Sequence, residues 1–207
     1  MNESLEQSAT MEGRSGERSG RAGTFGMLLF LAALGMLFLA MLLAYVVVRT
    51  QLINPDRQAY PPLGELTLPM GLWLSTFAIL LSSISLQFAL MAVRAGRLSA
   101  CRNAMIGTAA LVILFLAIQG PCLRELLLRH ADAIQKDIYS YAMMAMLVIV
   151  HAAHVIGGVI ALLVITRRVA VGRYSADSYG PVKYITMYWH FVDAVWLIMF
   201  NVMLLLG

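Results

Sequence analysis

The sequence predicts an all-α, polytopic membrane protein with five transmembrane helices in a bundle. Of its 207 residues, 60% are apolar and only 13% are charged, and the mean hydropathy is +0.79. Soluble domains have roughly half apolar and a quarter charged residues. Apolar stretches long enough to cross a hydrocarbon core of ~30 Å recur five times. These predicted spans are residues 25–48, 68–93, 103–128, 138–166 and 184–206.

Residues 1–24 are predicted to be a flexible polar tail that precedes a single membrane domain, residues 25–207. The tail is rich in Ser, Gly, Glu and Arg and has no aromatic residue, so it buries too little surface to order itself. Its four glutamates argue against an organelle transit peptide, and the apolar run after it is too long for a signal-peptide core.

The third and fourth spans depart from the usual length. Residues 103–119 are only ~25 Å long as a helix, so we expect this helix to continue through a kink at Pro121 to about residue 128. Residues 138–166 make a helix of ~43 Å, which must tilt or project beyond the hydrocarbon. The fifth span follows Gly180-Pro181, and Pro is tolerated in the first turn of a helix.

The distribution of Lys and Arg predicts the orientation. The tail and the second and fourth connections share one side and carry ten basic residues, whereas the opposite side carries five. The positive-inside rule therefore places the N-terminus in the cytoplasm and the C-terminus in the periplasm. No basic cluster is interleaved with aromatic residues, so no nucleic-acid partner is expected.

The two cysteines are predicted to stay unpaired within the chain. Cys101 and Cys122 lie near opposite ends of the third span, about 30 Å apart along a helix. A disulfide needs Cα atoms within about 7 Å.

Ionisable residues inside the spans are the most informative, because a mid-membrane aspartate costs about 2.5–3.5 kcal/mol. Asp193 shares a helix face with His190, and His151 shares one with His154, since each pair is three residues apart. Asp193 lies ~14 Å along the fifth span, and His154 lies ~18 Å from the matching end of the fourth. We therefore predict a contact between His154 and Asp193.

Other positions are predicted to join helices. Ala153, Gly157 and Ala161 form a smooth stripe at spacing four, which lets helices approach closely. Polar side chains in the second and third spans are expected to make interhelical hydrogen bonds: Ser82, Ser83, Ser85, Gln87 and Gln119.

Three histidines and one carboxylate also fit a metal or haem site, or a proton relay. The spacing of three differs from that of two-histidine zinc helices, and no further ligand is evident. The favoured interpretation is a structural polar network with no catalytic residue and no metal: His151, His154, His190, Asp193 and Gln119. Proton relay and haem ligation remain alternatives.

Several sequence motifs resemble the third subunit of cytochrome c oxidases. The most specific one, in residues 188–196, is Tyr-Trp-His-Phe-Val-Asp-Ala-Val-Trp, which departs from the family signature only at Ala194. His151-Ala-Ala-His154-Val-Ile-Gly157 is similar to the family segment His-Gly-Leu-His-Val-Ile-Gly. Weaker similarities occur at Gly26-Met27, residues 74–76 and residues 80–83. The likeness extends over roughly residues 26–207.

The resemblance implies a non-redox accessory subunit of a haem-copper terminal oxidase. Such a subunit packs on catalytic subunit I, which carries the haem and copper, and it binds phospholipid. The five-helix form implies a bacterial inner membrane and an aerobic, proton-pumping respiratory complex. Lipid or subunit contacts are expected at Trp73, Trp189, Trp196, Gly157 and Gly158.

Two positions depart from the family pattern. Leu34 and Cys122 stand where the family usually has glutamate, which weakens any proton-handling role for this subunit. Alternatives within the family are a quinol oxidase subunit III and an accessory protein of nitric oxide reductase. Alternatives outside it are a small transporter and a haem-binding membrane protein.

Overall fold

The computed structural model of this chain is all-helical and describes residues 2–52, 70–129, 138–172 and 179–206. Its five helices are α1 (Asn2–Leu52), α2 (Met70–Arg94), α3 (Leu98–Arg129), α4 (Ile138–Ala170) and α5 (Gly180–Leu206). Each contains a segment long and apolar enough to cross a membrane. The prediction of five spans in an all-α protein is therefore confirmed. Residues 68 and 69, the predicted start of the second span, lie outside the described residues.

The chain divides into two compact units, one ending at Leu37 and one beginning at Phe38. The first consists of the N-terminal part of α1. Residues 2–24 are helical and continuous with the apolar part of α1, and the flexibility of this tail stays a prediction. This segment contains no Pro, and beside its four Gly and four Ser it has four Glu and three Arg, which are good helix formers. A helix already nucleated in the adjoining apolar span extends into this segment without a second nucleation step.

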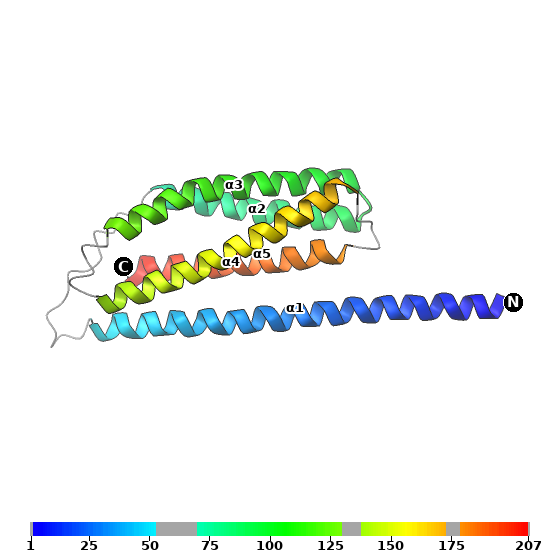
Figure 1. Cartoon of the computed structure of the whole chain (residues 1–207), viewed down its shortest axis with the longest axis horizontal. Coiled ribbons are helices and arrows are strands. Elements are labelled where there is room, and N and C mark those ends of the chain that lie inside the picture. Colours follow the sequence, from blue (N-terminus) through cyan, green and yellow to red (C-terminus); the bar gives the residue numbers. More distant parts are fainter. Residues whose placement is uncertain (1, 53–69, 130–137, 173–178, 207) are drawn as a thin grey trace. The chain divides into compact units, whose positions relative to one another are not determined.

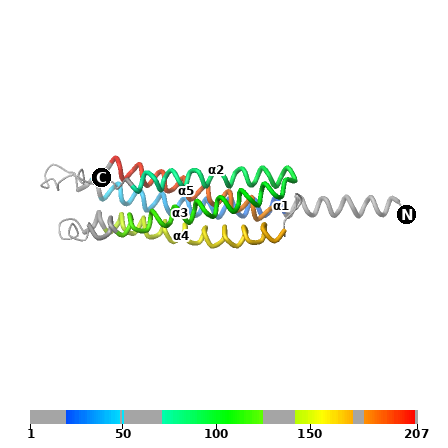
Figure 2. Tube along the Cα trace, turned by 90° about the horizontal axis from the view of Figure 1, so that it is seen from above, coloured from blue at the N-terminus to red at the C-terminus, as the bar shows by residue number. Residues whose placement is uncertain are grey.

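In the second unit, α2, α3, α4 and α5 form a closed ring of four helices. Contacts join α2 to α3, α3 to α4, α4 to α5, and α5 back to α2. Figure 1 shows these four helices running lengthwise beside one another, and Figure 2 shows them from above. As predicted, α3 continues through Pro121 and beyond residue 119.

Glycine ends two of these helices. Gly96 follows α2 with a φ of +71°, and Gly172 follows α4 with a φ of +74°. Behind Gly96, the amide of Arg97 donates to the carbonyl of Ala92 at 2.9 Å, the bond that defines a Schellman cap. Residues with a side chain rarely adopt this left-handed conformation. The cap lets α3 start within a few residues and turn back along α2.

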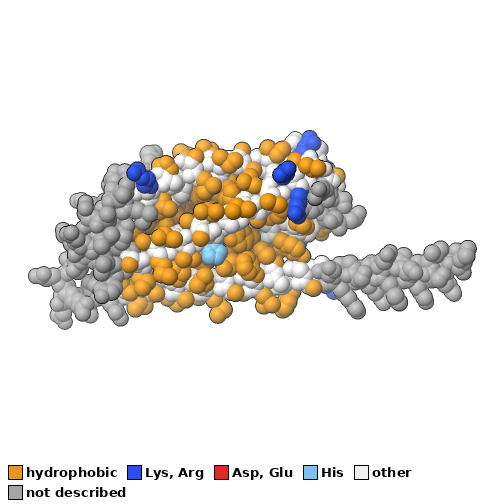
Figure 3. All heavy atoms as spheres, in the orientation of Figure 1, with side chains coloured by type: hydrophobic (Ala, Val, Ile, Leu, Met, Phe, Trp, Pro, Cys, Tyr) orange, Lys and Arg blue, Asp and Glu red, His pale blue; other side chains and the backbone are white. Residues whose placement is uncertain are grey.

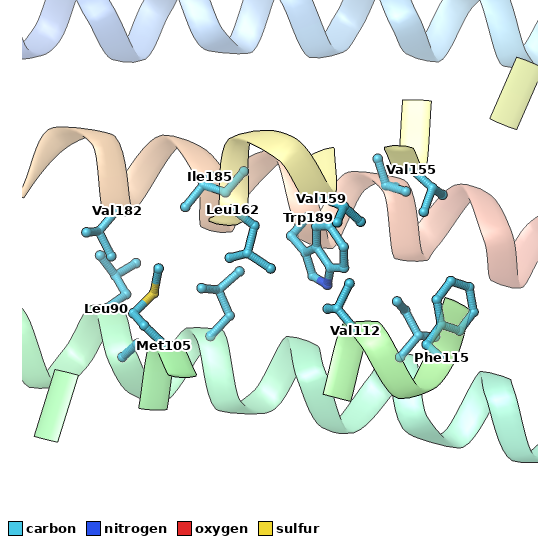
Figure 4. Close-up of a cluster of buried hydrophobic side chains, with 14 of the residues drawn as sticks. Leu90, Met105, Val112, Phe115, Val155, Val159, Leu162, Val182, Ile185 and Trp189 are labelled. Carbon is cyan, nitrogen blue, oxygen red and sulfur yellow. The ribbon is translucent and has the colours of Figure 1, made fainter. Parts of the chain in front are cut away.

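The interior of the ring is apolar and closely packed. Figure 4 shows Met105 and Val112 of α3 facing Leu162 of α4 and Trp189 of α5. Trp189, Leu162 and Met105 are completely inaccessible to solvent. Because lipid tails are as apolar as these side chains, the ring is stabilised by close van der Waals packing between its helices.

The outside of the helices is also apolar, as a membrane requires. Hydrophobic side chains cover the middle of the visible face in Figure 3, and Lys and Arg side chains lie near the helix ends. Arg94, at the end of α2, lies 5.6 Å from the ring centroid of Tyr179, just before α5. The second and fourth connections therefore lie at the same end of the ring.

Candidate functional site

The polar network begins at the contact between α2 and α5. Asp193 is buried in α5, and one of its carboxylate oxygens, Oδ2, accepts a hydrogen bond from the Ser83 hydroxyl of α2. Nδ1 of His190 lies 2.7 Å from the same Ser83 oxygen. Ser83 thus bridges the two ionisable side chains of α5.

His190 carries this network to the helix surface. Its Nε2 atom lies 3.3 Å from Oε1 of Gln87, one turn further along α2, and both side chains are exposed. The chain of contacts therefore runs from buried Asp193 through Ser83 and His190 to exposed Gln87. The expectation that His190 and Asp193 act from one helix face is confirmed.

The predicted contact between His154 and Asp193 is wrong. Asp193 bonds to Ser83 of α2, whereas Nδ1 of His154 lies 2.7 Å from the Val150 carbonyl one turn earlier in α4. The two residues were matched by depth alone. Depth does not fix the rotation of a helix about its axis, and α2 offers Asp193 a hydroxyl at the same level.

Two tryptophans extend the contact between α2 and α5. The Trp189 indole donates to Ser82 at 3.0 Å, and the Trp196 indole donates to Thr76 at 3.1 Å. Because residue numbers rise along α5 as they fall along α2, the two helices run antiparallel. A tryptophan needs a partner for its N–H when buried, and the hydroxyls of α2 supply it.

A second set of bonds links α2 to α3. Ser75 donates to Oε1 of Gln119 at 2.6 Å, and Thr108 donates to Ser85 at 3.0 Å. With the bonds of Ser82, Ser83 and Gln87, every polar side chain expected to join helices does so. Thr76 and Thr108 were not predicted, because a lone threonine in an apolar helix also bonds readily to its own backbone.

The histidines of α4 lie among aromatic rings. His151 is buried and stacked on Trp196, with ring centroids 5.7 Å apart and an interplanar angle of 22°. Phe38 presents its ring edge-on to His151 at 6.0 Å and to His154 at 5.3 Å. The two histidines therefore do share a face. Tyr188 also reaches α4, donating its hydroxyl to the His154 carbonyl at 2.8 Å.

The expected lipid and subunit contacts divide into two groups. Trp73 and Gly157 are exposed and remain available for such contacts. In contrast, Trp189, Trp196 and Gly158 are buried, which corrects their prediction as surface positions. The two indoles fill space between helices and are anchored by hydroxyls of α2.

The close approach of α4 and α5 occurs at Gly158 and not along the predicted stripe. A Cβ atom on Gly158 would lie 2.7 Å from Cε1 of Tyr188, whereas one on Gly157 would meet no atom within 4 Å. Ala153 is likewise exposed. Ala161, the third residue of the predicted stripe, is half-buried and packs against the buried core, so only part of the stripe lies outside the helix contacts.

The cysteines are both free, as their separation predicted. Cys122 is half-buried and packs against Gly71, where an added Cβ would come within 2.5 Å of its sulfur. Among the described residues, no group of three or more His, Cys, Asp or Glu side chains lies close enough to hold a metal ion.

Comparison with known proteins gives consistent matches. A sequence model of the family "Cytochrome c oxidase subunit III" matches residues 3–207. The chain is 31% identical over 188 residues to cytochrome c oxidase subunit 3 of Synechocystis sp., covering 88% of this chain and 75% of that protein. It is 27% identical over 185 residues to the subunit of Thermostichus vulcanus, covering 87% of this chain and 86% of that one.

A longer relative is cytochrome c oxidase subunit 3 of Marchantia polymorpha, which is 29% identical over 178 residues. That match covers 85% of this chain but 65% of the relative, slightly less than two thirds of its length.

Proposed function

Because this chain belongs to the cytochrome c oxidase subunit III family, we propose that it is the non-redox third subunit of a haem-copper terminal oxidase. In this proposal it packs on catalytic subunit I, which carries the haem and copper of an aerobic, proton-pumping complex. It lies in a bacterial inner membrane with its N-terminus in the cytoplasm. Phospholipids cover the helix faces that no other subunit covers.

The observation that carries the docking proposal is the exposed pair His190 and Gln87. Gln87 lies seven residues before Arg94, or ~10 Å inside the end of its span, and His190 is ten residues into its own. An imidazole and an amide at that depth would face hydrocarbon if the chain stood alone. Polar side chains at such depths normally face protein or water.

The surroundings of this pair fit a protein partner. The neighbouring α2 side chains are large, apolar and exposed: Ile84 at 67%, Met91 at 50% and Phe88 at 47%. We call this surface, with His190 and Gln87, the α2/α5 face. A second polytopic chain that supplied a polar group opposite His190 and apolar contacts around it would satisfy both parts of this face.

The contacts of the three histidines agree with a subunit that has no redox centre of its own. His154 and His190 engage protein groups through ring nitrogens, and His151 is stacked on an indole. The orientation agrees with the positions of Arg94, Arg97 and Arg102 near the turn from α2 to α3, the side that the positive-inside rule assigns to the cytoplasm.

Site-specific photocrosslinking tests the docking proposal. A benzoylphenylalanine at Ile84, on the α2/α5 face, should crosslink to a large haem-containing polypeptide when native membranes are irradiated. The matched position is Ile160 of α4, which is exposed at 59% but lies outside this face. Crosslinks of equal yield from both positions would refute the assignment of the face. Extraction of the chain alone, without any haem protein, would refute the function.

Labelling of introduced cysteines tests the orientation separately. A cysteine at Gly96 should react with an impermeant maleimide only in inverted vesicles. Reaction in right-side-out vesicles would reverse the proposed topology.

A further inference from the structure

The imidazole ring of His190 is held at both of its nitrogens, although the side chain is exposed. Nδ1 lies 2.7 Å from the Ser83 hydroxyl oxygen, and Nε2 lies 3.3 Å from Oε1 of Gln87. Both partners belong to α2, so the ring lies across the contact between α2 and α5. An exposed side chain changes rotamer within nanoseconds unless its neighbours hold it. Here the shorter of the two contacts is with a buried residue, Ser83.

The hydroxyl group of Ser83 is used differently from other hydroxyl groups of α2. Thr76 donates to the Leu72 carbonyl one turn earlier in the same helix. Ser82 likewise donates to the Ile79 carbonyl. Hydroxyl groups within helices commonly bond to their own backbone in this way. Ser83 makes no such bond to a described carbonyl, and its hydroxyl is directed at α5 instead.

Asp193 accounts for the direction of the Ser83 hydroxyl. It is buried in α5 and only 4% exposed, and its Oδ2 atom accepts the hydrogen bond from Ser83. Its other oxygen, Oδ1, has no partner in the described part of the chain. Leaving a buried polar group without any hydrogen bond is costly. The carboxyl group therefore keeps the hydroxyl away from the backbone of α2, where it also meets Nδ1 of His190.

We propose that Asp193 and Ser83 are positioning residues for the docking of a partner subunit at His190. This inference rests on the proposed docking of catalytic subunit I on the α2/α5 face. Asp193 holds the Ser83 hydroxyl, and the hydroxyl holds Nδ1 of His190, so the imidazole is presented to the partner in one orientation. The partner then meets a side chain that is already ordered, which avoids the cost of ordering a mobile one on binding.

Ser82 separates this positioning role from simple packing of the helices. It is fully buried, and its hydroxyl accepts a hydrogen bond of 3.0 Å from the Trp189 indole of α5. No hydrogen bond joins it to His190 in the described part of the chain. The variant Ser82→Ala therefore removes one bond between α2 and α5 without releasing the ring of His190.

Dissociation of the intact oxidase complex tests the proposal. The complex is purified in mild detergent and diluted, and the concentration at which half of this chain has left the haem-containing polypeptide is measured. We expect Ser83→Ala and Asp193→Leu to raise that concentration roughly 2- to 10-fold, the effect of ordering one side chain on binding. Ser82→Ala should leave it unchanged. Asp193→Asn, whose amide oxygen can still accept from Ser83, should dock like the parent.

A second background isolates the action through His190. His190→Leu removes the docking contact itself, so adding Ser83→Ala or Asp193→Leu should have no further effect on dissociation. A role confined to packing would give the same additional weakening in both backgrounds. If Asp193→Leu prevents folding, Ser83→Ala in the two backgrounds still decides the question.

Four results would overturn the proposal. Equal weakening by Ser82→Ala and Ser83→Ala would show that both serines only join the helices. A full effect of Ser83→Ala in the His190→Leu background would show that Ser83 does not act through the imidazole. His190→Leu complexes that dissociate like the parent, while Ile84 still crosslinks to the haem-containing polypeptide, would refute this inference and leave the docking proposal intact. Absence of the Ile84 crosslink would instead refute the docking on which the inference rests.

Discussion

The contact of Gly158 with Tyr188 gives the sharpest test of the packing between α4 and α5. In the variant Gly158→Ala, the new Cβ would lie 2.7 Å from Cε1 of Tyr188 and 3.3 Å from Cζ3 of Trp189. Both neighbours are aromatic rings, and the Tyr188 hydroxyl is tied to the His154 carbonyl. The Tyr188 ring cannot move aside without losing this hydrogen bond, so the two helices must separate to make room for the new methyl group.

The neighbouring glycine provides a matched control. The variant Gly157→Ala places the same methyl group where no atom lies within 4 Å. Both variants gain the same helix propensity, about 1 kcal/mol, so this contribution cancels in the comparison. Overpacking costs about 1–3 kcal/mol. We therefore expect Gly158→Ala to be less stable than Gly157→Ala by that amount.

The assay is unfolding of the full chain in mild detergent by increasing fractions of dodecyl sulfate, followed by tryptophan fluorescence. In a background with Tyr188→Leu, the stability penalty of Gly158→Ala should be smaller, because the free-energy effects of substitutions at contacting residues do not simply add. A difference between the two glycine variants below about 0.5 kcal/mol, the usual effect of a surface substitution, would refute the proposed contact.

Two further packing predictions use the same assay. Ser83→Ala should lower stability by about 1–3 kcal/mol because it leaves buried Asp193 without its hydroxyl partner, whereas Ser99→Ala, at an exposed position, should be neutral. The penalty should be smaller when Asp193→Ala is already present, and equal penalties in both backgrounds would contradict the bond. Gly71→Ala should cost about 1–3 kcal/mol, because its Cβ would lie 2.5 Å from the sulfur of Cys122. Cys122→Ala should recover most of that loss, and a Gly71→Ala protein as stable as the parent would show that the two residues do not pack together.

The sequence predicted the contacts within a helix better than those between helices. His190 and Asp193 were assigned to one face because three residues make most of a helical turn. Their partner on α2 was not predicted, although Ser83 had been singled out as an interhelical donor. Choosing between Ser83 and His154 requires the rotation of each helix, which depends on how all side chains of the ring pack.

Exposure was also difficult to predict for residues that look alike in sequence. Trp73 is exposed at 56%, whereas Trp189 is fully buried, yet both lie in apolar spans. Gly157 and Gly158 are adjacent, and only the second touches α5. In a membrane, hydrophobicity does not separate the inside from the outside, because lipid tails are as apolar as a protein core.

The sequence by itself determined the number of spans, the all-α class and the family, because hydropathy and short motifs are properties of the chain read locally. Only the tertiary structure decided that Ser83 bridges Asp193 and His190 and that Gly158 meets Tyr188. These features arise from the relative rotation and spacing of helices distant in sequence. That geometry is set by the sum of many small packing contacts.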